Sequence, residues 1–110
     1  MNILITGCAG FIGFHLSKSL LEYKKNKIYG IDNLNNYYDI NLKKDRLKIL
    51  KKNSNFKFYK SNILYYSELD KIFKKNNFDI VIHLAAQAGV RYSIKNPKKY
   101  FSSNIQGFFN

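Results

Sequence analysis

The sequence predicts an α/β fold in which a parallel sheet is covered by helices on both faces. Two observations carry this prediction. Short apolar runs alternate with segments of helical periodicity along all 110 residues, and a glycine-rich turn joins the first apolar run to the first helical segment. Strands linked through helices pair in parallel by right-handed crossovers. We expect the strand order 3-2-1-4, with the third strand at an edge and the first beside a ligand crevice.

The first half of the chain is predicted to contain two strands and two helices. Apolar runs indicate strands at 2–6 and 28–31. A helix over 11–25 should turn inward the residues that recur at helical spacing, Ile12, Leu16, Leu20 and Tyr23. A polar loop at 32–41 precedes a lysine-rich helix over 42–52. The residues expected to be buried on that helix are Leu42, Leu47, Ile49 and Leu50.

The second half repeats this alternation. Residues 56–60 alternate as an edge strand would. Ser67 and Asp70 have the spacing of a capping box and predict a helix start, with an inward face of Leu69, Ile72 and Phe73. The nearly continuous apolar run at 80–86 indicates a strand covered on both faces. The Asn-Pro pair at 96–97 predicts a cap and first residue for the last helix.

The turn after the first strand has the composition of a phosphate site. Gly7, Gly10 and Gly13 are spaced so that a sharp turn, a close approach of phosphates and close packing of the following helix are possible. Such a turn presents the N–H groups of a helix N-terminus to a pyrophosphate. Asp32 ends the second strand, where a carboxylate binds the adenosine ribose and repels a 2′-phosphate. The chain is therefore predicted to bind a dinucleotide, and NAD rather than NADP.

Composition disfavours several other classes. The formal net charge is +12, but only two of the 19 basic residues are Arg, and the lysines are spread over every expected helix and loop. This pattern argues against a nucleic-acid surface. No apolar stretch could span a membrane, and no secretory segment is present. We therefore expect a cytoplasmic protein with neither nucleic acid nor membrane as a partner.

The single cysteine and the two histidines are candidate functional groups. Cys8 lies near a helix N-terminus, which can activate a thiol, although a small residue tolerated in the turn is the preferred interpretation. His15 and His83 have no companions at metal-ligand spacing, so no metal site is predicted. The pair Tyr23 and Lys27 has the Tyr-x-x-x-Lys spacing of a dehydrogenase, but it lies at the sheet edge opposite the cofactor. No catalytic residue is assigned.

Two polar residues after the fourth strand are further candidates. Arg91 follows that strand at the sheet edge where ligands bind, and its planar fork suits a phosphate or a carboxylate. A surface Arg fits the sequence equally well. Asn104 falls on the apolar stripe of the last helix, where a buried amide needs hydrogen bonds. It could brace the backbone near the crevice, or it could be an interior cap or a partly exposed Asn.

Three stretches resemble a known family. Residues 6–13, Thr-Gly-Cys-Ala-Gly-Phe-Ile-Gly, resemble the signature of extended short-chain dehydrogenases, which include the sugar-nucleotide epimerases and dehydratases. Residues 30–39, Gly-Ile-Asp-Asn-Leu-Asn-Asn-Tyr-Tyr-Asp, and 81–93, Val-Ile-His-Leu-Ala-Ala-Gln-Ala-Gly-Val-Arg-Tyr-Ser, resemble the UDP-glucuronate 4-epimerases within that group. The resemblance implies a Rossmann-type fold. It also implies that residues 1–110 are the N-terminal part of the NAD-binding domain, without the rest of that domain or the substrate domain.

The resemblance also implies an activity. Tightly held NAD⁺ would take a hydride from C4 of a UDP-sugar, and the 4-keto intermediate would turn over before the hydride returns to its other face, interconverting UDP-glucuronate and UDP-galacturonate. The complete enzyme would be a homodimer. The family's Ser/Thr and its Tyr-x-x-x-Lys would follow residue 110, so we expect no catalysis from 1–110 alone. The alternatives are a dehydratase, decarboxylase or reductase of the same superfamily, or a non-catalytic dinucleotide-binding fragment.

The family's cofactor contacts map onto the strand ends and the turns behind them. The matching positions are Gly7, Gly10, Phe11, Ile12, Gly13, Asp32, Asn33, Asn62, Ile63, Leu84, Ala85, Ala86 and Asn104. Gln87 and Arg91 would border the sugar. One position departs from the family, because Asn62 stands where an Asp usually accepts the adenine amino group. The Asn carbonyl can still accept that bond, at a cost of about 1 kcal/mol.

Overall fold

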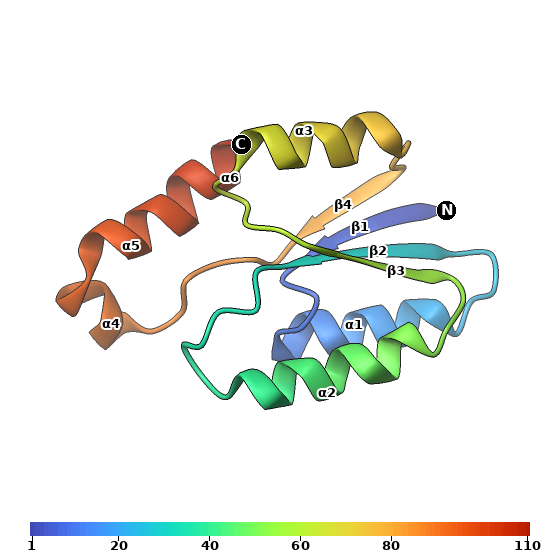
Figure 1. Ribbon diagram of the computed structural model, residues 1–110, viewed down its shortest axis with the longest axis horizontal. Helices are drawn as coiled ribbons and strands as arrows, with labels where there is room; N and C mark the ends of the chain where they lie inside the picture. Colours follow the sequence, from blue (N-terminus) through green and yellow to red (C-terminus); the bar gives the residue numbers. More distant parts are fainter.

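The computed structural model describes residues 1–110 and shows a four-stranded parallel sheet between two helical layers (Figure 1). The strands are β1 (Asn2–Thr6), β2 (Lys27–Asp32), β3 (Phe56–Lys60) and β4 (Ile80–His83). Their order is β3-β2-β1-β4, which confirms the predicted α/β Rossmann-type topology. In this order β1 has a neighbour on each side, so the turn that follows it reaches the middle of the sheet edge.

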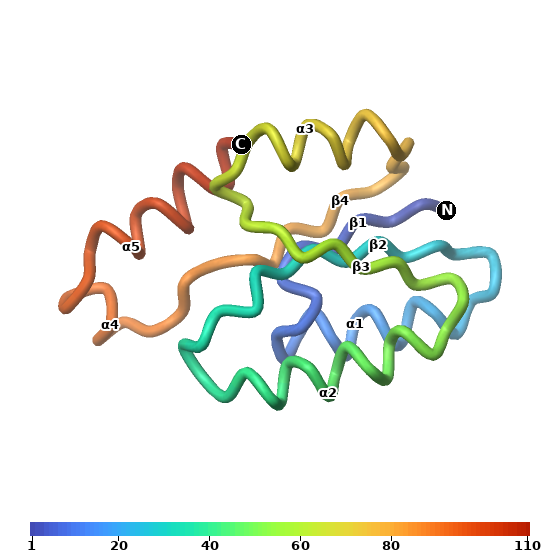
Figure 2. The backbone as a smooth tube through the Cα atoms, viewed as in Figure 1, coloured from blue at the N-terminus to red at the C-terminus, as the bar shows by residue number.

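The helices lie on opposite faces of the sheet. On one face are α1 (Phe11–Leu21) and α2 (Ile40–Lys51), and on the other is α3 (Tyr66–Lys75) (Figure 1). The remaining helical segments follow β4 and are α4 (Val90–Lys95), α5 (Pro97–Phe101), the π-helical turn η1 (Ser102–Gln106) and α6 (Gly107–Phe109). The chain then returns to the start of α3 (Figure 2), where the Asn110 side chain donates to the carbonyls of Ile63 and Leu64. No helix is long and apolar enough to cross a membrane.

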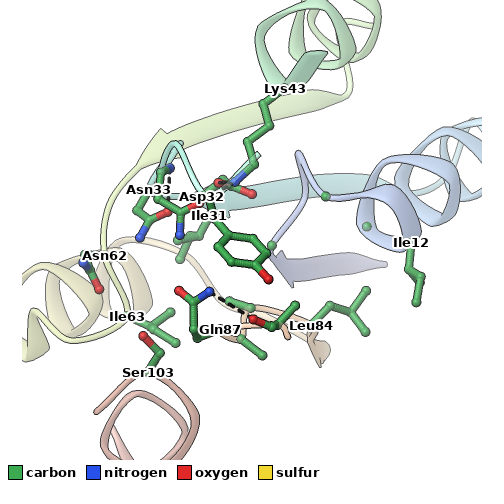
Figure 3. Close-up of a pocket in the computed structure, with 18 of the residues that line it drawn as sticks. Ile12, Ile31, Asp32, Asn33, Lys43, Asn62, Ile63, Leu84, Gln87 and Ser103 are labelled. Atoms are coloured by element: carbon green, nitrogen blue, oxygen red, sulfur yellow. Dashed lines mark hydrogen bonds and ion pairs between the residues drawn. The ribbon is translucent and has the colours of Figure 1, made fainter. Parts of the chain in front are cut away.

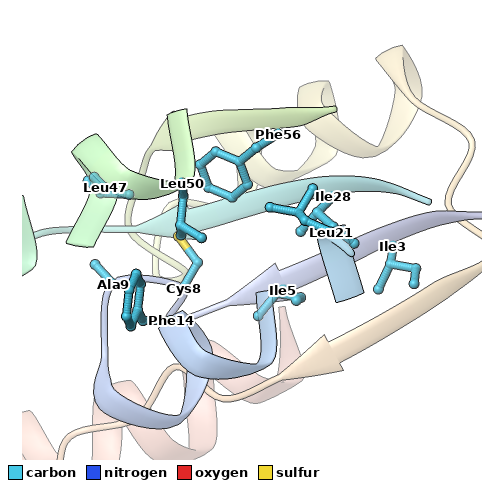
Figure 4. Packing of buried hydrophobic residues seen from close by; sticks show 10 residues of the cluster. All are labelled: Ile3, Ile5, Cys8, Ala9, Phe14, Leu21, Ile28, Leu47, Leu50 and Phe56. Carbon is cyan, nitrogen blue, oxygen red and sulfur yellow. The ribbon is translucent and has the colours of Figure 1, made fainter. Parts of the chain in front are cut away.

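Two apolar clusters hold the layers together. Successive side chains of β1 point to opposite faces, so Ile3 and Ile5 join one cluster and Leu4 joins the other. The larger cluster lies between the sheet and α1 and α2 (Figure 4). Its buried members are Ile3, Ile5, Cys8, Ala9, Phe14, Leu21, Ile28, Leu47, Leu50 and Phe56. Because β1 is buried on both faces, the turn at its end is anchored firmly in the core.

The predicted helices were wrong in several details. Ile12, Tyr23 and Phe73, which were expected to face inward, are exposed. Helix α1 ends at Leu21, because the Asn26 side chain donates to the Leu20 carbonyl and the next N–H groups form short turns. Helix α2 begins at Ile40 and exposes Leu42 and Ile49, so its buried stripe runs through Lys43 and two leucines instead. The capping box at 67–70 is absent, because α3 begins at Tyr66 without a side-chain cap; Asp70 pairs with Lys74.

Strand β4 is shorter and less covered than expected. It ends at His83, and Ile80 and Val81 remain 41% and 46% exposed. The chain leaves the sheet there because the N–H groups of Leu84 and Ala85 both donate to the Thr6 hydroxyl, each at 3.0 Å. The expected strand over 80–86 is therefore a short strand followed by an extended segment. The last helix starts at Pro97 as predicted, but α4 before it was not anticipated.

Candidate dinucleotide-binding site

A cavity of about 500 Å³ lies at the carboxyl ends of the strands (Figure 3). Ligands of open α/β sheets bind at this edge, where the connections diverge on either side of the first strand. The lining includes thirteen of the predicted contact residues, from the glycine turn, the end of β2, the loop after β3 and the segment after β4. They are Gly7, Gly10, Phe11, Ile12, Gly13, Asp32, Asn33, Asn62, Ile63, Leu84, Ala85, Ala86 and Gln87.

The glycine turn is shaped by close backbone approaches. Gly7 has φ +71°, and a Cβ there would lie 2.9 Å from the Ala85 nitrogen. A Cβ on Gly13 would overlap the carbonyl of Gly7, so the first turn of α1 can approach β1 only because Gly13 has no side chain. Gly10 caps α1 without a side-chain bond, and the first turn has no acidic residue. The first N–H groups of α1 are thus left for an anion, and this arrangement fits a pyrophosphate.

Asp32 is held rigidly at the end of β2. One carboxylate oxygen accepts the Ala9 N–H at 3.0 Å, the other accepts the Leu34 N–H at 2.9 Å, and the residue is only 6% exposed. Both bonds have a charged acceptor, and such bonds are stronger than neutral ones. The carboxylate therefore ties the glycine turn to the loop after β2, and its remaining lone pairs border the cavity. This geometry suits the two hydroxyls of a ribose.

Helix α2 contributes two cations that the sequence analysis missed. Lys43 is buried and its Nζ donates to the Asn35 side chain at 3.0 Å, while lying 3.9 Å from an Asp32 oxygen (Figure 3). Arg46 donates to the Ala9 carbonyl at 3.1 Å and lines the cavity. Their spacing of three positions places both on one helix face and is the signal that could have found them.

The β4 side of the cavity is organised by Thr6. Because its hydroxyl oxygen accepts two backbone N–H groups, its own proton is directed to Nδ1 of His83, 2.8 Å away. That bond requires a neutral Nδ1 acceptor. Burial likewise lowers the pKa of His83 from its ordinary value, because it disfavours the charged imidazolium. His83 thus shares a bracing role with Thr6.

Asn104 braces a second point on this side. Its Oδ1 accepts the Gln87 N–H at 2.7 Å and its Nδ2 donates to the Gln87 carbonyl at 3.1 Å. Asn104 does not itself line the cavity, whereas its neighbour Ser103 and the 4% exposed Gln87 do. The Asn104 amide therefore orients the backbone after β4, which agrees with the bracing role that the sequence offered for this residue.

Three other candidates can now be placed. Arg91 is exposed on α4 and is not among the lining residues, so contact with a sugar remains a prediction. Asn62 lines the cavity, and its Oδ1 also accepts the Leu64 N–H at 2.9 Å, so one lone pair is left for an adenine amino group. Cys8 is fully buried, and burial together with the Asp32 carboxylate raises the pKa of its thiol. It is a core residue and not a nucleophile.

The glycine turn, the aspartate at the end of β2 and the cavity at the strand ends define a Rossmann-type dinucleotide-binding fold. The family model described as GDP-mannose 4,6 dehydratase matches residues 4–110. The chain therefore belongs to the NAD-dependent epimerase/dehydratase family of sugar-nucleotide enzymes.

Relatives of known name are similar to this chain over all or nearly all of its length. Protein CapI of Staphylococcus aureus is 51% identical over all of this chain and 32% of its own. UDP-glucuronate 4-epimerase of Thermodesulfobacterium geofontis is 50% identical over 97% of this chain and 33% of its own. The structure of UDP-glucuronic acid 4-epimerase from Bacillus cereus with UDP-glucuronic acid and NAD has a TM-score of 0.88 and 39% identity, covering 97% of this chain and 33% of that one. The chain thus spans about one third of the length of these relatives.

Proposed function

We propose that this chain is the NAD-binding part of a UDP-glucuronate 4-epimerase. The observation that carries the proposal is the cavity itself, in which a glycine turn and a rigid Asp32 carboxylate meet at one sheet edge. Whole-chain similarity to named UDP-glucuronate 4-epimerases supports the substrate class. Because the chain spans one third of those relatives, the reaction is proposed for a longer protein that contains it.

In this proposal the residues of the chain hold and orient the cofactor. The N–H groups at the start of α1 bind the pyrophosphate, Asp32 and Asn33 bind the adenosine ribose, and Asn62 with Ile63 borders the adenine. Leu84, Ala85 and Ala86 form an apolar wall along the rest of the dinucleotide. Bound NAD⁺ supplies a hydride acceptor for C4 of the sugar.

The sugar is proposed to approach from the segment after β4. Gln87 is held by Asn104, so its position is set before any ligand arrives. Arg91 lies four residues further on, at the start of α4, where its guanidinium can meet a carboxylate or a phosphate outside the cavity. Catalytic proton transfer is assigned to residues of the longer protein outside 1–110, and the complete enzyme is proposed to be a homodimer.

Product analysis tests the reaction. The complete enzyme is incubated with NAD⁺ and UDP-glucuronate, and the nucleotide sugars are separated and identified by NMR. A mixture of UDP-glucuronate and UDP-galacturonate supports the proposal. The family model bears the name of a dehydratase, which favours a second candidate function. Loss of water or of CO₂ from the sugar would establish a dehydratase or decarboxylase instead.

The activity of residues 1–110 alone tests whether the catalytic groups lie outside them. Residues 1–110 alone are expected to give no epimerisation, because the family's Tyr-x-x-x-Lys finds no counterpart at the cofactor edge: Tyr23 and Lys27 lie at the opposite edge, where β2 begins. The measurement is the same product analysis at high protein concentration. Turnover by this fragment would show that catalytic groups lie within it.

A further inference from the structure

The cavity has three charged side chains, and they are neighbours. They are Asp32 at the end of β2 and two cations from the first half of α2, Lys43 and Arg46. All other lining residues are uncharged, so two cations against one carboxylate leave a formal charge of +1. A ribose is neutral, and the pyrophosphate is assigned to the N–H groups at the start of α1, so neither requires this surplus cation. The surplus cation therefore favours a further anion at this end of the cavity.

Lys43 depends on Asp32 for its charge partner. The residue is 5% exposed, and its Nζ lies 4.8 Å from the centre of the Tyr38 ring. Its hydrogen bond to Asn35 is to a neutral amide, and Asp32 is the one carboxylate within 4.0 Å. A buried ammonium is costly without an anion beside it. If Asp32 lost its charge, Lys43 would need another anion.

Arg46 has no carboxylate partner at all. The chain forms two ion pairs, Lys43 with Asp32 and Lys74 with Asp70, and Arg46 is in neither. Its Nη1 donates to the Ala9 carbonyl and, at 3.4 Å, to the Tyr38 hydroxyl. A guanidinium carries five N–H donors in a planar fork, so several remain for an anion. The N–H of the same residue, Ala9, donates to Asp32. Arg46 and the Asp32 carboxylate therefore both bind the backbone of Ala9 in the glycine turn.

We propose that Lys43 and Arg46 form a latent site for the 2′-phosphate of an adenine dinucleotide, and that the Asp32 carboxylate alone closes this site in favour of NAD. The proposal rests on the proposed NAD-binding function and extends it to the basis of cofactor selectivity. Asp32 repels a 2′-phosphate and holds Lys43 as its ion partner. Without that charge, the same surroundings present two cations to a phosphate.

The test is a titration of the full protein with matched ligands. Binding of NAD⁺ and NADP⁺ is measured by calorimetry, together with AMP and adenosine 2′,5′-bisphosphate, which isolate the 2′-phosphate. The variant Asp32→Asn keeps the size and one acceptor oxygen but removes the charge. We expect its NADP⁺ dissociation constant to fall at least tenfold, and NADP⁺ to bind more tightly than NAD⁺. Circular dichroism confirms that the variant is folded.

Double variants identify the cations. Asp32→Asn with Lys43→Met, and Asp32→Asn with Arg46→Met, should each lose most of the gain in NADP⁺ affinity. Asp32→Asn with Lys48→Met is the matched control, because Lys48 is exposed on α2 and does not line the cavity. Should Asp32→Asn fail to fold, the single variants Lys43→Met and Arg46→Met decide the question. Each should weaken binding of the bisphosphate more than binding of AMP.

The outcomes separate the two proposals. An Asp32→Asn protein that gains no NADP⁺ affinity would overturn the latent site. So would double variants in which Asp32→Asn gains the same NADP⁺ affinity whether it is combined with Lys48→Met, Lys43→Met or Arg46→Met. If the wild type binds neither NAD⁺ nor AMP, the proposed function fails. The bisphosphate titrations of the variants still report on the cations in that case, because their readout is the 2′-phosphate alone.

Discussion

The two sides of the cavity are built in different ways. On the β2 side, Asp32 is buried and receives two backbone N–H groups, and the neighbouring turn is anchored in a core that is covered on both faces. On the β4 side, the strand is half-exposed, and the segment after it depends on two side chains, Thr6 and Asn104. The β2 side is therefore held by a buried carboxylate within a core covered on both faces, whereas the segment after the half-exposed β4 depends on hydrogen bonds from Thr6 and Asn104.

The largest effect is expected at the glycine turn. Gly13→Ala should destabilise the chain by about 3 kcal/mol and abolish NAD binding, because the new Cβ overlaps the Gly7 carbonyl. Urea unfolding and calorimetric titration measure the two effects. Gly10→Ala is the matched control, since its Cβ would lie 3.2 Å from the same oxygen and needs only a small shift. Equal losses of stability in both variants would contradict this account of Gly13.

A smaller effect is expected from Thr6→Val. The substitution keeps the shape of the side chain but leaves the Ala85 N–H without its acceptor and the Leu84 N–H with the Thr6 carbonyl alone. Stability should fall by about 1–3 kcal/mol, as for other buried groups that lose a partner. Thr6→Ser retains the hydroxyl and should keep most of the stability. If the valine and serine variants unfold at the same urea concentration, Thr6 does not organise the β4 side.

Asn104→Ala should cost about 1–2 kcal/mol, because it removes two hydrogen bonds to the Gln87 backbone. NAD affinity should also fall, whereas Gln106→Ala, two residues away and exposed, should leave it unchanged. Both quantities are measured by the same unfolding and titration experiments. Wild-type NAD affinity in Asn104→Ala would show that the Gln87 backbone does not depend on this amide.

The smallest effect concerns pH. The pKa of His83 is lowered in the folded chain, so the unfolded chain takes up this proton first as the pH falls through about 6.5. The contribution of His83 to stability is therefore complete above that pH and declines below it. Melting temperatures between pH 8 and pH 5 should show this decline in the wild type and a weaker one in His83→Gln. Identical profiles would exclude His83 as the group responsible.

The sequence predicted the residues at the strand ends better than those that helix α2 contributes to the cavity. Gly7, Gly13 and Asp32 follow from local spacing, because a strand end places its next residues directly at the sheet edge. Lys43 and Arg46 were missed because the face that α2 turns to the cavity depends on where it begins, after an irregular loop. The exposure of Leu42 and Ile49 has the same cause.

The sequence by itself determined the alternation of strands and helices, the order of the sheet and the place of the glycine turn and Asp32. Each of these depends on periodicity or on a backbone requirement within a few neighbouring residues. Only the tertiary structure decided that Thr6 would end β4 and that Asn104 would hold Gln87. These bonds join residues 78 and 17 positions apart, so no local pattern encodes them.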